Sequence, residues 1–189
     1  MKALEEKILA EGKVYPGNVL NVGSFLNQCI DVPFMMAMGQ EIARLYADAN
    51  VTKVLTVEAS GIALAMAAAY HLNVSLVFAK KSKSFNMDDS VYSARVFSYT
   101  HNLENRIVVS RDFLVKEDRV LLVDDFLANG EALRGMTELC RLAGAAVAGC
   151  AVAIEKGFQH GGDALRAEGI RVESLAIIDS MDRESLTFR

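Results

Sequence analysis

The sequence predicts a single α/β domain in which helices flank a central, mostly parallel sheet. Beyond residue 50, strand-like segments alternate with segments of helical spacing, which is typical of a parallel sheet covered on both faces. The strand candidates are short apolar runs, as strands buried on both faces require. The chain has 189 residues, is 52% hydrophobic and contains no internal repeat or linker, so it can form one domain with a full core.

The elements follow one another in a regular order. Residues 1–13 predict an amphipathic helix, because Leu4, Ile8 and Leu9 recur at helical spacing. The later predictions are a strand at 51–59, a helix at 61–72, a strand at 74–80, strands at 91–100 and 105–115 joined by the polar turn 101–104, a strand at 119–125, a helix at 131–143, and strands at 145–156 and 172–179. The short turn at 101–104 indicates an antiparallel hairpin. The helix at 131–143 would bury one face. That face carries Leu133, Met136, Cys140 and Ala143.

Composition and missing motifs exclude several classes of protein. The net charge of −4 gives no general nucleic-acid footprint, and the one basic cluster, residues 80–83, is short. Three cysteines without a CxxC pair favour a reducing compartment, and three scattered histidines give no transition-metal site. The chain contains neither GxGxxG after a strand nor GxxxxGK[ST]. The longest apolar run, residues 143–154, is too short to span a bilayer, so we expect a soluble, cytoplasmic protein without membrane or nucleic-acid partners.

One strand end carries an unusual pair of acids. The apolar run 120–123 ends in Asp124 and Asp125, and two buried neighbouring carboxylates need a compensating partner. A ligand rich in hydroxyl groups would supply it. The small-residue loop 127–131 follows and can wrap backbone amides around a phosphate at a helix N-terminus. Together these features predict a ribose 5-phosphate site, whereas a capped strand–helix turn would explain only Asp125 or Asn129.

Three further strand ends would face the same edge of the sheet, where ligands bind in such folds. Residues 57–63 bring Glu58 and a small-residue turn that suits an anion, although this motif alone is weak. Residues 79–90 bring lysines that could meet phosphate oxygens, and they lead into a hairpin that we interpret as a mobile lid. Residues 154–160 bring Lys156, which either pairs with Glu155 at the surface or reaches a polar ligand edge.

The segment "VLLVDDFLANGEAL" resembles the phosphoribosyl-diphosphate signature of the type I phosphoribosyltransferases. The resemblance is strongest to the bacterial xanthine branch of that family and covers essentially the whole chain. It includes, in order, "FLNQCID" (25–31), "VEASGIA", "VFAKKSKS", "DDFLANG", "VAIEKGFQ" and "RVESLAIIDSM". Ala128 and Asn129 stand where many members of the wider family carry two threonines, and the xanthine branch has this same departure.

The resemblance implies a type I phosphoribosyltransferase fold and a purine-salvage reaction. In that reaction 5-phosphoribose passes from phosphoribosyl diphosphate to N9 of xanthine, which gives xanthosine 5′-monophosphate and diphosphate. It further implies a homodimer, and Mg²⁺ held mainly by the diphosphate and water without dedicated protein ligands. Within a single domain, 1–189, residues 1–36 would form a small hood that binds the base. Residues 82–112 would form a flexible hairpin lid, and 115–180 the phosphoribosyl-binding half.

The resemblance also assigns site residues. Asp124 and Asp125 would hold the ribose hydroxyls beside the developing cation. The 5-phosphate would be held by Ala128, Asn129, Gly130, Glu131 and Ala132, and the diphosphate by Glu58, Ala59, Ser60 and Gly61 with Lys80 and Lys81. Leu20, Asn27 and Lys156 would contact the base. Tyr92, Phe97 and Tyr99 are candidates to approach the leaving group, although hairpin packing is the stronger interpretation for at least two of them.

Two alternatives to transfer onto xanthine stay open at this point. The first is transfer to another base, namely guanine, hypoxanthine, adenine or orotate, which would change only the base pocket. The second is a regulator that senses phosphoribosyl diphosphate and binds DNA or RNA. The acidic composition disfavours this regulator, and residues 1–50 show no winged-helix pattern.

Overall fold

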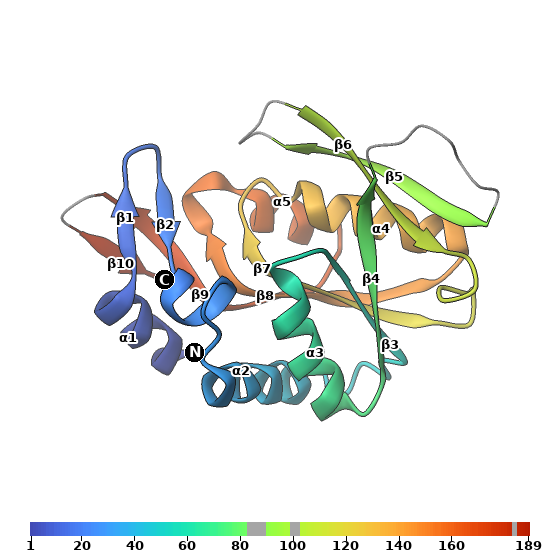
Figure 1. Ribbon diagram of the computed structural model, residues 1–189, viewed down its shortest axis with the longest axis horizontal. Coiled ribbons are helices and arrows are strands. Elements are labelled where there is room, and N and C mark those ends of the chain that lie inside the picture. The colour runs from blue at the N-terminus through green and yellow to red at the C-terminus, as the bar shows by residue number, and fades with distance from the viewer. Residues whose placement is uncertain (83–89, 99–102, 183–184) are drawn as a thin grey trace.

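The computed structural model describes residues 1–82, 90–98, 103–182 and 185–189, and it confirms a central, mostly parallel sheet flanked by helices (Figure 1). Eight strands form this sheet in the order β10-β9-β8-β7-β3-β4-β6-β5, and β1 pairs with β2 in a separate hairpin. The pairs β9–β8, β8–β7, β7–β3 and β3–β4 are parallel, whereas β10, β6 and β5 add antiparallel edges.

The elements have the following bounds: α1 Lys2–Glu11, β1 Lys13–Tyr15, β2 Val19–Asn21, the π-helical turn η1 Gly23–Asn27, α2 Val32–Leu45, β3 Lys53–Val57, α3 Gly61–Leu72, β4 Ser75–Ser82, β5 Val91–Ser98, β6 Leu103–Ser110, β7 Arg119–Leu127, α4 Glu131–Ala143, β8 Ala146–Lys156, the 3-10 turn η2 Gly157–Gln159, α5 Gly161–Ala167, β9 Val172–Met181 and β10 Leu186–Phe188. The helices predicted at 61–72 and 131–143 are confirmed at both ends.

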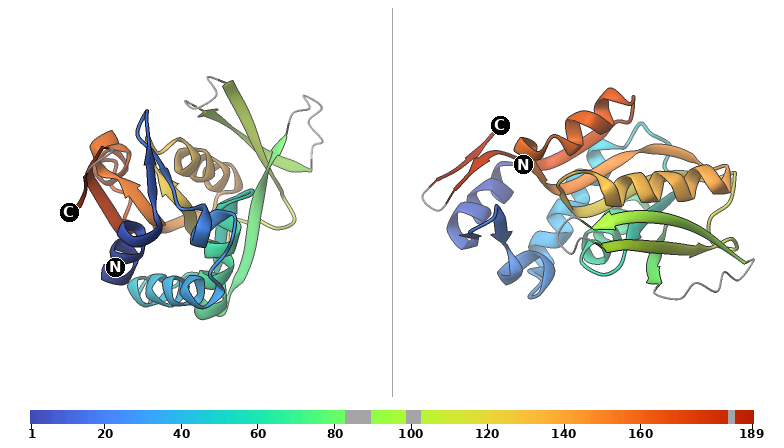
Figure 2. Two further views of the ribbon diagram at one scale, coloured as in Figure 1. Left: turned by 60° about the vertical axis from the view of Figure 1, so that its left-hand side comes forward. Right: turned by 90° about the horizontal axis from the view of Figure 1, so that it is seen from above.

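Helices cover the sheet on both sides, with α2 and α3 on one face and α4 and α5 on the other (Figures 1 and 2). Strand β7 shows why its sequence is continuously apolar. Leu121 and Val123 point into the core beneath α2 and α3, while Val120 and Leu122 point into the core beneath α4. Because successive side chains alternate between two buried faces, every position in this stretch must be apolar.

Local chemistry sets the ends of the helices that flank the site. Asp31 caps α2 by accepting a hydrogen bond from the Phe34 amide at 3.1 Å, and a proline follows in the first turn. Helix α4 lies between two glycines with left-handed backbone, Gly130 at φ +87° and Gly144 at φ +72°. Only glycine adopts this conformation without steric cost, so these two residues fix where α4 begins and ends.

Strand β7 is longer than the sequence predicted. It runs to Leu127, so Asp124 and Asp125 lie inside the strand and not at its end. The extension arises because β8 keeps pairing with β7 as far as Leu127–Glu155, whereas β3 pairs only as far as Leu55–Leu122. The two acids therefore lie beyond the last residue of β7 that pairs with β3, in the part of β7 that pairs only with β8.

The β1–β2 hairpin and the β5–β6 hairpin flank the end of β7, one on each side of it (Figure 2). Strands β5 and β6 form the predicted antiparallel hairpin, although β6 ends at Ser110 and not at residue 115. Residues 101–102 of the predicted turn, and residues 83–89 and 99–102 of the predicted lid, lie outside the described residues, whereas Leu103 and Glu104 belong to β6 and not to the turn. No helix within the described ranges is long and apolar enough to cross a membrane.

Candidate active site

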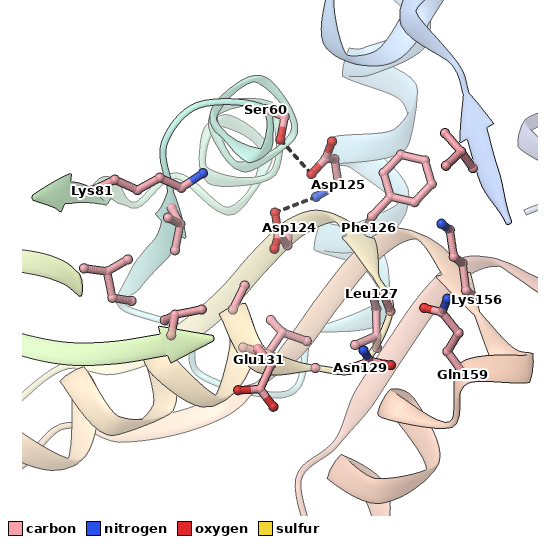
Figure 3. Close-up of a pocket in the computed structure, with 18 of the residues that line it drawn as sticks. Ser60, Lys81, Asp124, Asp125, Phe126, Leu127, Asn129, Glu131, Lys156 and Gln159 are labelled. Carbon is pink, nitrogen blue, oxygen red and sulfur yellow. Dashed lines mark hydrogen bonds between the residues drawn. The ribbon is translucent and has the colours of Figure 1, made fainter. Parts of the chain in front are cut away.

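A cleft of about 690 Å³ opens at the carboxyl ends of β3, β7 and β8 (Figure 3). Its walls come from the β1–β2 turn on one side and from the β5–β6 hairpin on the other. The lining residues are Gly17, Asn18, Val19, Val57, Glu58, Ser60, Lys81, Val96, Ile107, Asp124, Asp125, Phe126, Leu127, Ala128, Asn129, Gly130, Glu131, Ala132, Leu133, Lys156 and Gln159. This position agrees with the general rule for ligand sites in open parallel sheets.

The two aspartates occupy opposite sides of β7 and meet different partners. Both side chains are largely buried, with Asp124 at 9% and Asp125 at 6% exposure. The Asp124 carboxylate accepts a hydrogen bond from the backbone N–H of Asp125 at 3.0 Å. Burial raises the pKa of the Asp124 carboxyl well above its ordinary value, and the neighbouring Asp125 charge adds to this effect, while Lys81 opposes it.

Asp125 is held from two other segments of the chain. The Ser60 hydroxyl donates to one carboxylate oxygen at 2.9 Å, and the Asn27 amide donates to the other at 3.2 Å. Ser60 precedes α3, and Asn27 ends η1 in the N-terminal region. Asp125 therefore links the predicted diphosphate loop to the predicted base-binding segment. In this structure Asn27 contacts the acid, and its role toward a base stays a prediction.

The loop 128–132 lines the cleft with all five of its residues. It leads into α4 through the left-handed Gly130, so the first amides of that helix face the cleft. Unpaired helix N-terminal amides and the helix dipole favour an anion at this position. The arrangement suits the predicted 5-phosphate site.

The turn after β3 places some of its predicted diphosphate residues on the cleft. Glu58 and Ser60 line it, and a Glu58 carboxylate oxygen accepts a hydrogen bond from the Lys81 amide at 2.6 Å. The Glu58–Ala59 peptide is cis. Ala59 and Gly61 are not among the lining residues, and Gly61 instead packs close to Asp124.

Lys80 and Lys81, the two lysines predicted to bind the diphosphate, are consecutive residues of β4. Successive side chains of a strand point to opposite faces, so only one of the pair can face the cleft. Lys81 lines it, whereas Lys80 is exposed elsewhere.

Lys156 ends β8 at the other side of the cleft. Its ammonium group donates to the Asn18 carbonyl at 2.8 Å and lies 5.8 Å from the centre of the Phe126 ring. Burial lowers its pKa. Glu155 is bound elsewhere, by both guanidinium nitrogens of Arg166 at 2.9 and 2.7 Å and by the Ser174 hydroxyl. The alternative that Lys156 only pairs with Glu155 is therefore wrong.

Leu20, the third predicted base contact, belongs to the hydrophobic core and is 7% exposed. It is not among the residues that line the cleft. Its neighbours in the β1–β2 turn line the cleft instead, namely Gly17, Asn18 and Val19.

Sequence reasoning missed five lining residues that now carry part of the site: Gly17, Asn18, Val19, Phe126 and Gln159. Phe126 directly follows the acid pair, so its place in the site could have been predicted from the sequence. The Pro16-Gly17-Asn18 turn is a recognisable turn signal, but only the tertiary fold brings it to the cleft.

The candidate lid hairpin contributes Val96 and Ile107 to the cleft wall. Tyr92 lies against Arg111, whose guanidinium carbon is 4.9 Å from the ring centre, so this tyrosine takes part in hairpin packing. The side chain of Phe97 and the whole of Tyr99 lie outside the described residues.

The family comparison can now be set beside this geometry. A phosphoribosyl transferase domain is matched over residues 34–177. The chain therefore belongs to the phosphoribosyltransferase family. Among curated relatives, a xanthine phosphoribosyltransferase of Bifidobacterium longum is 52% identical over 192 residues and is covered, like this chain, to 100%. A protein of the same name from Bacillus cereus is 50% identical over 188 residues, which cover 100% of this chain and 95% of that protein.

Solved structures support the type I fold. An adenine phosphoribosyltransferase from Giardia lamblia complexed with 9-deazaadenine aligns with a TM-score of 0.77 at 26% identity, over 92% of this chain and 96% of that one. The adenine phosphoribosyltransferase of Saccharomyces cerevisiae aligns with a TM-score of 0.73 at 16% identity, over 93% and 99%. At such low identity the second likeness shows the fold alone.

Proposed function

We propose that this protein transfers 5-phosphoribose from phosphoribosyl diphosphate to N9 of xanthine. One observation carries the proposal: a buried pair of acids, Asp124 and Asp125, lies between an amide-lined loop and a lysine in one cleft. The loop suits a phosphate, the acids suit ribose hydroxyls and the lysine suits an oxo group. The names of the relatives that are 50–52% identical over the full chain support the same activity.

The mechanism follows from the charge that develops on the ribose. Cleavage of the bond between C1 and the diphosphate leaves cationic character on the ring, and N9 of the base attacks C1 as the base gives up its imidazole N–H proton to water or to the released diphosphate. The chain needs no covalent nucleophile for this step. Asp124 and Asp125 hold the hydroxyls and place negative charge near the cation, while the loop 128–132 fixes the 5-phosphate. Closure of the cleft would exclude water and so prevent hydrolysis.

The donor chemistry of the cleft fits Mg²⁺. The carboxylates of Glu58, Asp124, Asp125 and Glu131 line the cleft and could hold such an ion, although the described residues contain no preformed group of three metal-binding side chains. Mg²⁺ commonly keeps several waters and uses one or two carboxylates with substrate phosphates. When bound, the ion would offset negative charge on the leaving diphosphate. We therefore propose that it arrives with phosphoribosyl diphosphate.

Base choice rests on Lys156. An ammonium group offers three donors and no acceptor, so it matches an oxo group and not an amino group. Xanthine carries oxo groups at C2 and C6, whereas adenine carries an amino group at C6 and nothing at C2. Guanine and hypoxanthine share the C6 oxo group and are the nearest competing substrates.

The test is product identification with the purified protein. Phosphoribosyl diphosphate and Mg²⁺ are incubated in parallel with xanthine, guanine, hypoxanthine and adenine, and the nucleotides are separated and identified by mass. We expect xanthosine 5′-monophosphate as the main product. Preferential formation of another nucleotide would identify its base, and not xanthine, as the substrate. If no nucleotide forms with any of the four bases, transfer is refuted.

We further propose a homodimer that works in the cytoplasm. Its three thiols, Cys29, Cys140 and Cys150, are all free, which fits a reducing compartment. Sedimentation at several concentrations tests the dimer, and a monomer at assay concentrations would refute it. Fractionation of the producing cells tests the compartment.

A further inference from the structure

Gln159 has a buried oxygen that lacks a partner. Its Oε1 atom is buried and accepts no hydrogen bond from any residue that the structure describes. A buried carbonyl oxygen without a donor is unfavourable, and such groups in folded proteins call for an explanation. Among the side chains that the structure describes, Thr56 carries the other unpartnered buried oxygen, but Thr56 does not line the cleft.

The position of Gln159 supplies the explanation. It ends the turn η2, which directly follows Lys156 at the end of β8, and both residues line the cleft. Figure 3 draws the side chains of Lys156 and Gln159 on the same wall of the cleft, which Phe126 also lines. Gln159 thus contributes an amide to the same cleft as the ammonium group that the proposed function assigns to the base.

The ligand group that completes Gln159 must be a donor, because the orphan atom is a carbonyl oxygen. The 5-phosphate and diphosphate present mainly acceptor oxygens, and the ribose hydroxyls face Asp124 and Asp125. A ring N–H of the base is the remaining donor. Lys156 and Gln159 together therefore match an edge on which an oxo group stands beside an N–H.

Xanthine has such an edge at N1. Its N1–H stands between the C2 and C6 oxo groups, so it neighbours whichever oxo group Lys156 takes. Adenine has the reverse pattern, with an acceptor at N1 beside the amino group at C6. We propose that Gln159 is a specificity-determining residue: rotation of its side-chain amide when the base binds brings the oxygen, which is buried in this structure, to the N1–H of an oxopurine. This inference rests on the proposed function and adds a residue to its base site.

The central test compares Gln159→Met with the wild type, because methionine keeps the length of the side chain and removes the amide. We expect the kcat/KM for xanthine to fall by roughly 5- to 150-fold, while the KM for phosphoribosyl diphosphate stays unchanged. The thermal midpoint should hold or rise, because the variant removes an unsatisfied buried oxygen. A purely structural role would instead lower the midpoint. Gln40→Met, at an exposed position in α2, is the matched control and should change neither value.

A second substrate isolates the N1–H. The base 1-methylxanthine carries a methyl group in place of that hydrogen. The wild type should discriminate against it, and Gln159→Met should lose most of that discrimination because it has no acceptor to leave unmatched. The steric cost of the methyl group is common to both proteins, so it cancels in the comparison.

Two results would overturn the inference. One is an unchanged kcat/KM for xanthine in folded Gln159→Met, and the other is equal discrimination against 1-methylxanthine in both proteins. Failure of the proposed function would show in the wild type alone, as absence of transfer to xanthine in the base panel. The two failures are therefore distinguishable.

Discussion

Replacement of Gly161 by alanine tests how the phosphate loop is supported from behind. Gly161 begins α5 and does not line the cleft, but the loop lies directly against it. A Cβ atom at Gly161 would stand 2.6 Å from the carbonyl carbon of Asn129, 2.8 Å from the amide nitrogen of Gly130, and closer still to the Ala128 oxygen. All three are backbone atoms, so no side chain can rotate away to make room.

The size of the effect follows from these contacts. Ordinary contact begins near 3.4 Å, so relief of the 2.6 Å contact alone needs a movement of about 0.8 Å, and the closer Ala128 oxygen needs more. Helix α5 resists movement because Arg166 is bound to the buried Glu155 through two hydrogen bonds. The loop therefore takes up most of the shift. A displacement near 1 Å in a positioning group can cost about 100-fold in rate, and we expect a rise of at least about 10-fold in the KM for phosphoribosyl diphosphate.

The assay is steady-state kinetics with each substrate varied in turn, together with thermal unfolding. Gly161→Ala should raise the KM for phosphoribosyl diphosphate and leave the KM for the base within about twofold. Gly169→Ala is the control, because Gly169 has φ +84° with no atom within 4 Å of the added carbon, so it carries backbone strain without contact to the loop. A folded Gly161→Ala protein with wild-type KM for phosphoribosyl diphosphate would refute the reasoning.

Three further predictions concern the cleft itself. Gly130→Val forces a branched residue into left-handed backbone, so it should weaken phosphoribosyl-diphosphate binding more than base binding; calorimetry giving unchanged affinity would contradict this. Lys156→Ala should reduce xanthine kcat/KM by at least about fivefold while diphosphate-substrate binding barely changes, and unaltered xanthine kinetics would count against a base contact. Asp124→Asn combined with Asp125→Asn should abolish transfer in a protein that keeps its circular dichroism spectrum, and near-wild-type turnover would exclude the acids from the reaction.

Much of the fold could be predicted because local signals and tertiary structure agree. Helix α3 starts after the small-residue turn and ends before Asn73, which has left-handed backbone, and α4 lies between two glycines. These helix ends depend on neighbouring residues alone, so the local sequence is enough to predict them. Helix α2 was not assigned from the sequence, although Asp31 and Pro33 are typical start signals.

The observed structure differs from the prediction where strand pairing between residues far apart in the sequence sets the bounds of an element. Strand β4 extends to Ser82 because β6 pairs with Lys80, Lys81 and Ser82. The extension fixes the alternation that sends Lys81 to the cleft and Lys80 away from it. No local pattern encodes this result, because the partner strand comes later in the chain and from an antiparallel hairpin.

The site shows the same division. The acid pair and the loop after it are contiguous, so their chemistry can be predicted from the sequence. The hydrogen bond from Asn27 to Asp125 joins residues 98 positions apart, and the unpartnered oxygen of Gln159 exists only in the packed fold. Contacts of this kind depend on tertiary distances, which a single sequence without related sequences does not contain.

The raised pKa of Asp124 makes a last prediction about stability and pH. The unfolded chain releases the Asp124 proton near the ordinary carboxyl pKa of about 3.9, whereas the folded protein keeps it to higher pH because the side chain is buried beside Asp125. Between these two values the folded state binds more protons than the unfolded state. The contribution of Asp124 to stability is therefore complete below the unfolded pKa and is lost as pH rises through the folded pKa.

Asp124→Asn removes this titration and keeps an oxygen that can accept the Asp125 N–H. The free energy of unfolding, measured in urea across a pH series, should be higher in the variant than in the wild type at neutral pH. The difference in free energy of unfolding between the variant and the wild type should shrink as the pH falls toward about 4. Taking the difference cancels acids whose pKa is lowered in both proteins, such as Glu155 beside Arg166, since their stabilisation is lost on acidification in each. A gap that stays constant with pH, or widens on acidification, would mean that burial of Asp124 does not disfavour its charge.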